Sequence, residues 1–264
     1  MTILLSARQI SKQFTGLLAV NEVDVDVAAG SVHGIIGPNG AGKTTFFNLV
    51  SGLLPPTSGT LTLDGHDITG AAPYERTRMG VARTFQNIRM FSDMTVVENV
   101  MTGMHTRLDS SGLAALLRLP AFRREERAAK AKAMELLEFV RLADKAGLRS
   151  GDLSYGDQRR LEIARALAGN PRLLLLDEPA AGMNPTETRD LAALLRQVAR
   201  RDITLLLVEH NMGFVMDLCD RITVLNFGRK IAEGTAREVR DDPAVIEAYL
   251  GTKVAERLAK AHGA

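Results

Sequence analysis

The chain has 264 residues, of which 45% are hydrophobic and 24% are charged, and its formal net charge is +2. This length and composition fit one large globular α/β domain, or a core with a small subdomain, and the nearly balanced charge provides no global field that would favour nucleic acid. The single cysteine, Cys219, excludes an internal disulfide, fits a reducing compartment, and is expected to be a small buried apolar residue.

The N-terminal residues Met1 to Ser6 are moderately apolar, but they lack the basic start and long apolar core of a signal peptide. No window of the sequence approaches the roughly 18 uncharged apolar residues that a membrane span requires. If the protein works at a membrane, we therefore expect it to do so through a partner that spans it.

The first third of the chain predicts strands and one helix. Val20 to Val27 alternates apolar and polar residues, as a half-buried strand does. Val32 to Ile36 is a short apolar strand that ends in a glycine-rich loop, and Lys43 to Leu53 then has the apolar spacing of a helix. Leu61 to Leu63 followed by Asp64-Gly65 predicts a strand that enters a tight turn.

From about Asn87 to Gly151 the sequence has helical periodicity and little strand signal. The apolar positions of one predicted helical face are Ala129, Ala133, Leu136, Leu137 and Val140. Strand patterns return at Leu173 to Leu176 and at Thr204 to Val208, and an acidic residue follows each of them. Strands that alternate with helices predict a mostly parallel sheet, so the middle segment is expected to be a helical subdomain inserted into an α/β core.

A phosphate-binding loop is predicted directly after the strand Val32 to Ile36. Residues 37–44 match the pattern G-x-x-x-x-G-K-[ST] at every position, and an amphipathic helix follows them. They are Gly37, Pro38, Asn39, Gly40, Ala41, Gly42, Lys43 and Thr44, and Thr45 is expected to contact the nucleotide as well. The glycines allow a tight turn whose N–H groups converge on phosphates, while Lys43 would reach the β- and γ-phosphates and the Thr44 hydroxyl would bind magnesium. A chance glycine-rich turn would not explain both the pattern and its context.

Two carboxylates end the apolar strand Leu173 to Leu176. Because an acidic strand tip needs compensation for its charge, we expect Asp177 to hold Mg²⁺, directly or through water. Glu178 would then orient and deprotonate an attacking water. A solvated acidic turn before Pro179 is the alternative, but the phosphate loop makes it the weaker one.

The segment LSYGDQRRLEIARAL, residues 153–167, narrows the class of nucleotide enzyme, because it resembles the ABC signature sequence and the helix that follows it. A serine hydroxyl and glycine N–H groups at a helix N-terminus form an anion site, here Ser154 and Gly156. In the family this site faces the γ-phosphate held by a second subunit. Tyr155 and Asp157 depart from the usual glycine and glutamine, and taken alone the segment would be a short polar helix cap.

Three further positions match the family in the expected order. The resemblance implies that Gln86 reaches Mg²⁺ and the attacking water, that His210 contacts the γ-phosphate, and that Phe14 stacks on adenine. Individually, a lone histidine or phenylalanine is more often a core or surface residue. Asn184 stands where most of the family has aspartate, so communication between the two ATP sites is expected to differ in detail.

The resemblance covers nearly the whole chain and implies a P-loop NTPase core, the ABC ATPase head, with an antiparallel β portion and an inserted helical subdomain. We expect the core to comprise residues 1–86 and 152–250, the helical subdomain residues 87–151, and a C-terminal tail residues 251–264. The segments EPAAGMNP (178–185), FQNIRMF (85–91) and AYLG (248–251) resemble the ATPase subunits of branched-chain amino-acid importers. Urea-importer and lipopolysaccharide-export ATPases are similar enough to compete.

The implied function is Mg-dependent ATP hydrolysis that powers import of a small solute. The implied partners are transmembrane permease subunits, a second ATPase subunit that is either identical or a paralogue, and indirectly a periplasmic or extracellular binding protein. The implied location is peripheral, on the cytoplasmic face of the cell membrane. An ABC-type nucleic-acid maintenance ATPase is the alternative of another class, but a compact insertion and balanced charge disfavour it. A non-hydrolytic scaffold would be expected to lack Glu178 or His210, and both are present.

Overall fold

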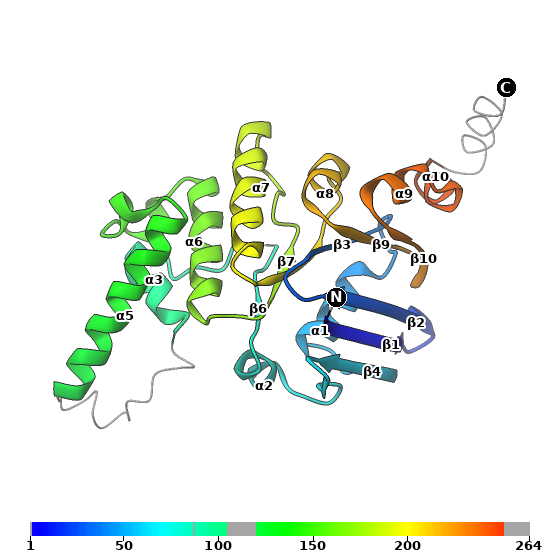
Figure 1. Cartoon of the computed structure of the whole chain (residues 1–264), viewed down its shortest axis with the longest axis horizontal. Coiled ribbons are helices and arrows are strands. Elements are labelled where there is room, and N and C mark those ends of the chain that lie inside the picture. The colour runs from blue at the N-terminus through cyan, green and yellow to red at the C-terminus, as the bar shows by residue number, and fades with distance from the viewer. Residues whose placement is uncertain (1, 87, 105–119, 251–264) are drawn as a thin grey trace.

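The computed structural model describes residues 2–86, 88–104 and 120–250, and Figure 1 shows how their elements are arranged. The predicted tail 251–264 and Asn87 of the FQNIRMF segment lie outside the described residues. Among the residues described, no helix combines the length and the apolar character that crossing a bilayer requires.

The described residues contain a six-stranded sheet in the order β10-β9-β3-β8-β7-β6. Its strands are β3 (Val32–Ile36), β6 (Val81–Arg83), β7 (Leu173–Asp177), β8 (Thr204–Val208), β9 (Arg221–Asn226) and β10 (Arg229–Gly234). Strands β6 to β9 and β3 pair in parallel, and only the edge strand β10 is antiparallel to its neighbour. The predicted mostly parallel sheet is therefore confirmed, and the carboxyl ends of β3, β7 and β8 meet at one edge.

A second sheet of four strands, in the order β2-β1-β4-β5, is antiparallel throughout. It consists of β1 (Ile3–Phe14), β2 (Leu17–Ala28), β4 (Ser58–Leu63) and β5 (His66–Asp67). This sheet is the antiparallel β portion that the family resemblance implied, and Asp64 and Gly65 form the expected tight turn between β4 and β5.

The helices are α1 (Lys43–Ser51), α2 (Pro73–Arg78), α3 (Val96–Thr102), α5 (Pro120–Phe139), α6 (Tyr155–Ala168), α7 (Pro185–Ala199), α8 (Met212–Leu218), α9 (Ala236–Asp241) and α10 (Pro243–Leu250). Short 3-10 turns occupy Ala143–Lys145 and Ser150–Asp152. The prediction of a helix from Lys43 to Leu53 was two residues too long. Gly52 adopts φ 79° and donates its N–H to the Leu49 carbonyl, which ends α1 at Ser51.

Two hydrophobic cores lie on opposite faces of the six-stranded sheet (Figure 1). In β8, Leu205 and Leu207 face the core that contains α7 and α8, whereas Leu206 and Val208 face the core that contains α1 and the antiparallel sheet. Because both faces are covered, the strand reads as a continuous apolar run rather than an alternating one.

Helices α3, α5 and α6 pack against one another at one end of the molecule (Figure 1). All five residues of the predicted apolar face of α5 and its continuation are buried, from Ala129 at 7% exposure to Ala133 and Leu137 at 0%. The division of the chain at 151/152 stays a prediction, and the packing of α6 against α3 and α5 favours an extension of the helical subdomain to Ala168.

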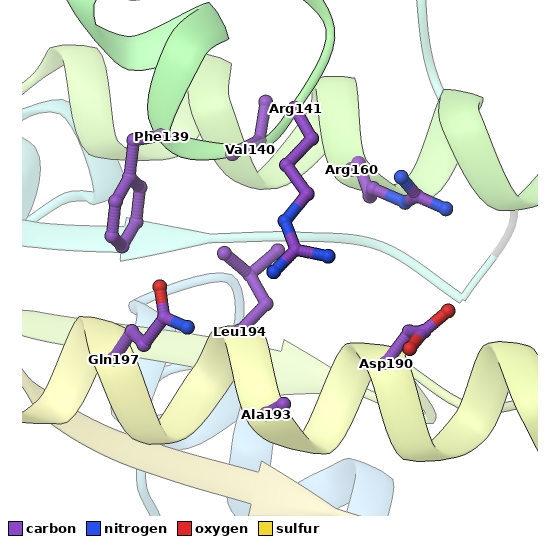
Figure 2. A pocket seen from close by; sticks show the side chains of 8 residues that line it. All are labelled: Phe139, Val140, Arg141, Arg160, Asp190, Ala193, Leu194 and Gln197. Carbon is purple, nitrogen blue, oxygen red and sulfur yellow. The ribbon is translucent and has the colours of Figure 1, made fainter.

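The seam between this helical group and α7 contains a cavity of about 80 Å³. Figure 2 shows Arg141 extending from beyond the end of α5 toward Leu194 of α7, with Phe139 and Gln197 on one side and Arg160 and Asp190 on the other. The end of α5 therefore meets α7 both through buried apolar residues, Val140 and Leu194, and through long polar side chains around a small space.

Candidate functional site

The phosphate loop joins β3 to α1 at the carboxyl edge of the sheet. Gly37, Gly40 and Gly42 all have positive φ, at 150°, 79° and 98°. A Cβ atom on Gly37 would lie 2.1 Å from the Leu225 carbonyl oxygen, and one on Gly42 would lie 2.4 Å from that of Ala19. The close approach of neighbouring backbone therefore requires glycine at both positions.

Lys43 is held within this loop. Its ammonium group donates hydrogen bonds to the carbonyl oxygens of Gly37 at 2.7 Å and Pro38 at 2.9 Å. Burial lowers the pKa of Lys43, and the negative charge of Glu178 opposes that shift. The lysine charge thus lies between the loop backbone and the carboxylate at the end of β7.

The three residues predicted to be catalytic lie together at the end of β7. Gln86 donates from Nε2 to Glu178 Oε2 at 2.8 Å, and His210 Nδ1 lies 3.6 Å from the same oxygen. Glu178 has φ 44°, a left-handed conformation that is rare for a residue other than glycine. The structure therefore brings Gln86, Glu178 and His210 to one point, although their individual roles stay predictions.

Arg83 was not predicted as a site residue, yet it contacts Asp177 directly. Its Nη2 donates to Asp177 Oδ2 at 2.8 Å, and its Nη1 donates to Asn48 and Ser51 of α1. The guanidinium also lies 5.3 Å from the ring centre of Phe47. Arg83 thereby ties the end of β7 to α1, which follows the phosphate loop.

Glu209 is a second acidic residue that organises the site, and it is fully buried at 0% exposure. Its Oε1 accepts a hydrogen bond from the Ala180 N–H, and its Oε2 accepts from the N–H groups of His210 and Asn211. The Glu209 carboxylate therefore anchors the loop after Glu178. It also anchors the segment that contains His210, the residue predicted to contact the γ-phosphate.

The predicted signature residues lie at the N-terminus of α6. Ser154 is exposed and caps the helix, with its Oγ accepting from the Asp157 N–H at 3.3 Å. Asp157, which with Tyr155 departs from the family pattern in this segment, is buried and paired with Lys145 at 2.5 Å. A Cβ atom on Gly156 would lie 3.1 Å from Glu187 Oε1, so glycine allows α7 to approach closely.

A buried ion pair connects α6 to the segment that contains Gln86. Arg159 and Glu162 are 0% and 2% exposed at the side chain, and their closest charged atoms are 2.7 Å apart. Arg159 donates to the carbonyl oxygens of Phe85 and Gln86, and Glu162 accepts from the Phe85 N–H. Burial raises the pKa of Glu162, and Arg159 opposes that shift.

The phosphate loop borders a cavity of about 340 Å³. It is lined by Leu17, Leu18, Ala19, Gly40, Ala41, Gly42, Lys43, Thr44, Thr45, Phe227 and Gly228. Phe14, the predicted adenine-stacking residue, does not line this cavity. It pairs across the β1–β2 turn with Leu17, which does line the cavity. Ser154 and Gly156 of the signature segment are not part of the lining either.

Tyr249 of α10 is a further residue near the loop. Burial raises the pKa of its phenol, and a hydrogen bond from the Gly37 backbone opposes that shift. The sequence indicates Tyr249 only as part of the AYLG segment that carries the family resemblance.

The predicted metal ligands provide oxygen atoms of the kind that Mg²⁺ prefers. Thr44 offers a hydroxyl, Gln86 an amide oxygen and Asp177 a carboxylate. No group of three or more His, Cys, Asp or Glu side chains suited to a metal ion occurs among the described residues. This donor set fits a magnesium ion bound through few protein ligands and nucleotide phosphates, which is how Mg²⁺ is commonly held.

Asn184, the third departure from the family pattern, has a local structural role. It is the N-cap of α7, where its Oδ1 accepts from the N–H groups of Thr186 at 2.9 Å and Glu187 at 3.0 Å. Asparagine and aspartate are both favoured at the N-cap, so Asn184 caps the helix although it lacks the negative charge of aspartate.

Comparisons with known proteins agree with this geometry. A family model described as ABC transporter matches residues 20–181, and one described as branched-chain amino acid ATP-binding cassette transporter matches residues 229–255. The chain is 49% identical to the high-affinity branched-chain amino acid transport ATP-binding protein BraF of Pseudomonas aeruginosa, over 94% of this chain and 98% of that protein. It is 37% identical to the lipopolysaccharide export system ATP-binding protein LptB of Acidithiobacillus ferridurans, over 95% and 98%.

Solved structures give the same result. The ADP conformation of an ATP-binding cassette of an ABC transporter superposes with a TM-score of 0.84 at 34% identity, covering 96% of this chain and 100% of that one. A dimeric post-hydrolysis state of an ATP-binding cassette bound to ADP and Pi superposes with a TM-score of 0.73 at 25% identity, covering 88% and 99%.

Proposed function

The chain belongs to the ABC transporter family as an ATP-binding and ATP-hydrolysing subunit, and from this premise we propose that it powers import of branched-chain amino acids through separate membrane-spanning subunits. The similarity to BraF over nearly the full length of both proteins supports the substrate class, as does the match of residues 229–255 to the branched-chain amino acid transporter model. The second candidate is lipopolysaccharide export, which the lower identity to LptB favours less.

The observation that carries the catalytic proposal is the convergence of Gln86 and His210 on one oxygen of Glu178, beside Lys43. Glu178 accepts the proton of the attacking water, and Gln86 orients that water. Lys43 and His210 contact the γ-phosphate and stabilise the charge that develops on it.

Thr44, Gln86 and Asp177 would hold Mg²⁺. When bound, the ion would neutralise charge on the β- and γ-phosphates. Arg83 keeps Asp177 oriented through its 2.8 Å ion pair, which supports Asp177 as an anchored ligand and not a mobile one.

A second ATPase subunit completes the site in this proposal. Ser154 is exposed at the N-terminus of α6, next to Gly156, which lies close to Glu187 of α7. These two residues support an anion site for the γ-phosphate of a partner's nucleotide. The partner is either a second copy of the chain or a paralogue, and the dimeric cassette among the similar structures supports such pairing.

A large groove supports the contact with the permease. It has a volume of about 680 Å³, and Arg89, Phe91, Met101 and Arg165 are among its lining residues. Phe91 is 53% exposed there, although it is a large apolar side chain. We assign this groove to a membrane subunit. The proposal accordingly includes a peripheral location on the cytoplasmic face of the membrane. It also includes only indirect contact with a binding protein and no contact with nucleic acid.

The catalytic proposal is tested with Glu178→Gln. We expect kcat for ATP hydrolysis to fall by at least about a hundredfold, because the general base is removed, while ATP still promotes dimerisation. Glu135→Gln is the matched control, since it removes only an exposed ion pair with Lys132. Unchanged hydrolysis in Glu178→Gln would contradict the assignment.

The transport proposal is tested by purifying the chain from membranes together with its transmembrane partners and reconstituting them in vesicles. Uptake of leucine, isoleucine or valine that requires ATP and Glu178 is the expected result. ATP-dependent movement of lipopolysaccharide or urea instead would replace the branched-chain assignment while leaving the ATPase assignment intact.

A further inference from the structure

The turn between β9 and β10 carries Phe227, which at 84% exposure is the most exposed large hydrophobic side chain among the residues that the structure describes. Its exposure means that packing against the rest of the chain does not explain its presence. A single exposed apolar side chain is ordinary, but here the backbone conformation is unusual as well.

Phe227 and Gly228 form a two-residue hairpin turn, with Asn226 paired to Arg229. Both have positive φ, at 44° and 77°. Hairpin turns of this kind favour Asn-Gly or Asp-Gly, because a bulky side chain is strained at positive φ. The turn between β4 and β5 follows that preference, with Asp64 at φ 51° and Gly65 at 76°. Phenylalanine at position 227 therefore weakens the turn that it occupies.

The turn is fixed against the phosphate loop. The Gly228 N–H donates to the Ala41 carbonyl oxygen at 3.0 Å, and the Asn21 N–H donates to the Gly228 carbonyl oxygen at 2.8 Å. A Cβ atom on Gly228 would lie 2.8 Å from the Ala19 carbonyl oxygen, so the turn also packs closely on β2. The position of the Phe227 backbone relative to the loop is thus set by hydrogen bonds on two sides.

Phe227 lines the 340 Å³ cavity beside the loop, together with Leu17 and Leu18. These two leucines are 68% and 41% exposed, so they add apolar surface to the cavity. Lys43 and Thr44 add polar groups to the same lining. A nucleotide offers partners for both, because it carries charged phosphates and a planar base with apolar faces.

We propose that Phe227 is a nucleotide-contacting residue whose ring packs against the base and thereby raises the affinity for nucleotide. The inference rests on the proposed function only in requiring that phosphates bind at Lys43. It explains why a strained and exposed phenylalanine stands where asparagine would form a better turn.

The test measures binding of MgADP to the purified chain by calorimetry, at concentrations where the chain is monomeric. We expect Phe227→Asn to weaken MgADP binding by about tenfold, within the range measured for base–aromatic stacking. The same variant should raise Tm by about 2 °C, because asparagine relieves the strain of the turn. Affinity and stability thus move in opposite directions, which damage to the fold would not produce.

Three controls sharpen the test. Phe227→Tyr keeps an aromatic ring and should bind MgADP within about twofold of the unmodified chain. Asp64→Asn changes the equivalent turn position away from the cavity and should leave affinity unchanged. Binding of inorganic pyrophosphate, which has no base, should be the same with and without Phe227→Asn.

An unchanged MgADP affinity in Phe227→Asn would overturn the proposal. So would a loss confined to ATP-driven dimerisation, which would place the ring against a partner subunit. Failure of the proposed function is a different result, because Lys43→Ala would then leave MgADP and pyrophosphate binding intact.

Discussion

The phosphate loop and the signature segment are both predicted to hold phosphate, but the chain builds them differently. The loop lies at the carboxyl edge of the six-stranded sheet, with Ala41 in one core, Lys43 bonded to its own loop carbonyls and Gly42 packed closely on Ala19. The signature segment lies at the N-terminus of α6, where Ser154 is the N-cap. Ser154 does not line the cavity beside the phosphate loop of the same chain. In the proposed function the loop therefore holds phosphate within one chain, whereas the signature segment requires a partner's nucleotide.

The two regions also depend on different forces. Covered apolar strands and close backbone approach fix the loop, so its geometry follows from the core. The signature helix also packs apolar residues into a core, but its attachment to the Gln86 segment depends on charges, since Arg159 and Glu162 bind the backbone of Phe85 and Gln86. Changes that act on one region should consequently leave the other intact.

The largest expected effect comes from Arg159→Met, which removes the charge that holds the signature helix to the Gln86 segment. Breaking a buried pair leaves Glu162 uncompensated, so we expect the free energy of unfolding to fall by about 4 kcal/mol, measured by urea denaturation. If the variant remains folded at low temperature, its affinity for ADP measured without magnesium should be unchanged, because Arg159 contacts the Gln86 segment and not the phosphate loop.

Arg160→Met is the matched control on the same helix. Arg160 is 28% exposed and lies 3.7 Å from Asp157, so its loss should cost less than about 1 kcal/mol. Adding Glu162→Leu to Arg159→Met should recover much of the lost stability. A similar cost for the two arginine variants would show that the buried pair does not hold the helix.

The second prediction concerns the acid sensitivity of folding stability, through His33 of β3, the strand that precedes the phosphate loop. His33 of β3 is 1% exposed and contacts Thr223, and burial lowers its pKa to about 4. The folded state therefore binds fewer protons than the unfolded state between about pH 4 and the usual value of 6.5, so stability is lost as pH falls through that window. At pH 5 we expect a loss of about 2 kcal/mol relative to pH 7.5.

Comparing His33→Gln with the unmodified chain isolates the contribution of His33, because the carboxylates titrate in both proteins. The difference in unfolding free energy between pH 7.5 and pH 5 should be smaller in the variant by about 2 kcal/mol. An identical pH dependence in the two proteins would show that His33 does not control the acid stability of the core.

The smallest expected effect comes from Ser154→Ala at the signature tip. Loss of the cap should cost about 1 kcal/mol of stability and lower Tm by about 3 °C. MgADP affinity of the monomer should stay the same, whereas ATP hydrolysis at dimer-forming concentrations should fall. A weaker monomer affinity would contradict the separation of the two phosphate sites.

The phosphate loop and the acidic end of β7 could be predicted from sequence because each is a contiguous pattern. Asp177 and Glu178 follow four leucines, and the pattern of the loop is local to residues 37–44. The roles of Arg83 and Arg159 could not be predicted in this way. Arg83 reaches Asp177 only because β6 pairs with β7, and Arg159 reaches Phe85 across 74 residues of chain.

Two other features were missed for different reasons. Strand β1 was not predicted because its buried residues, such as the adjacent Leu4 and Leu5, do not alternate strictly with exposed ones. Phe227 carries no periodic or motif signal, although the dipeptide Phe-Gly in place of Asn-Gly is a visible anomaly once the turn is known. Pattern reasoning therefore finds elements and motifs, but not contacts that depend on strand pairing.

The buried carboxylate of Glu209 has a consequence for motion. Its two oxygens bind the backbone of Ala180 on one loop and of His210 and Asn211 on another. Two segments that share one anchor cannot shift independently without exposing a buried charge, so together they have fewer degrees of freedom than their lengths imply. Rearrangement of the loop after Glu178 should therefore displace His210 in the same step.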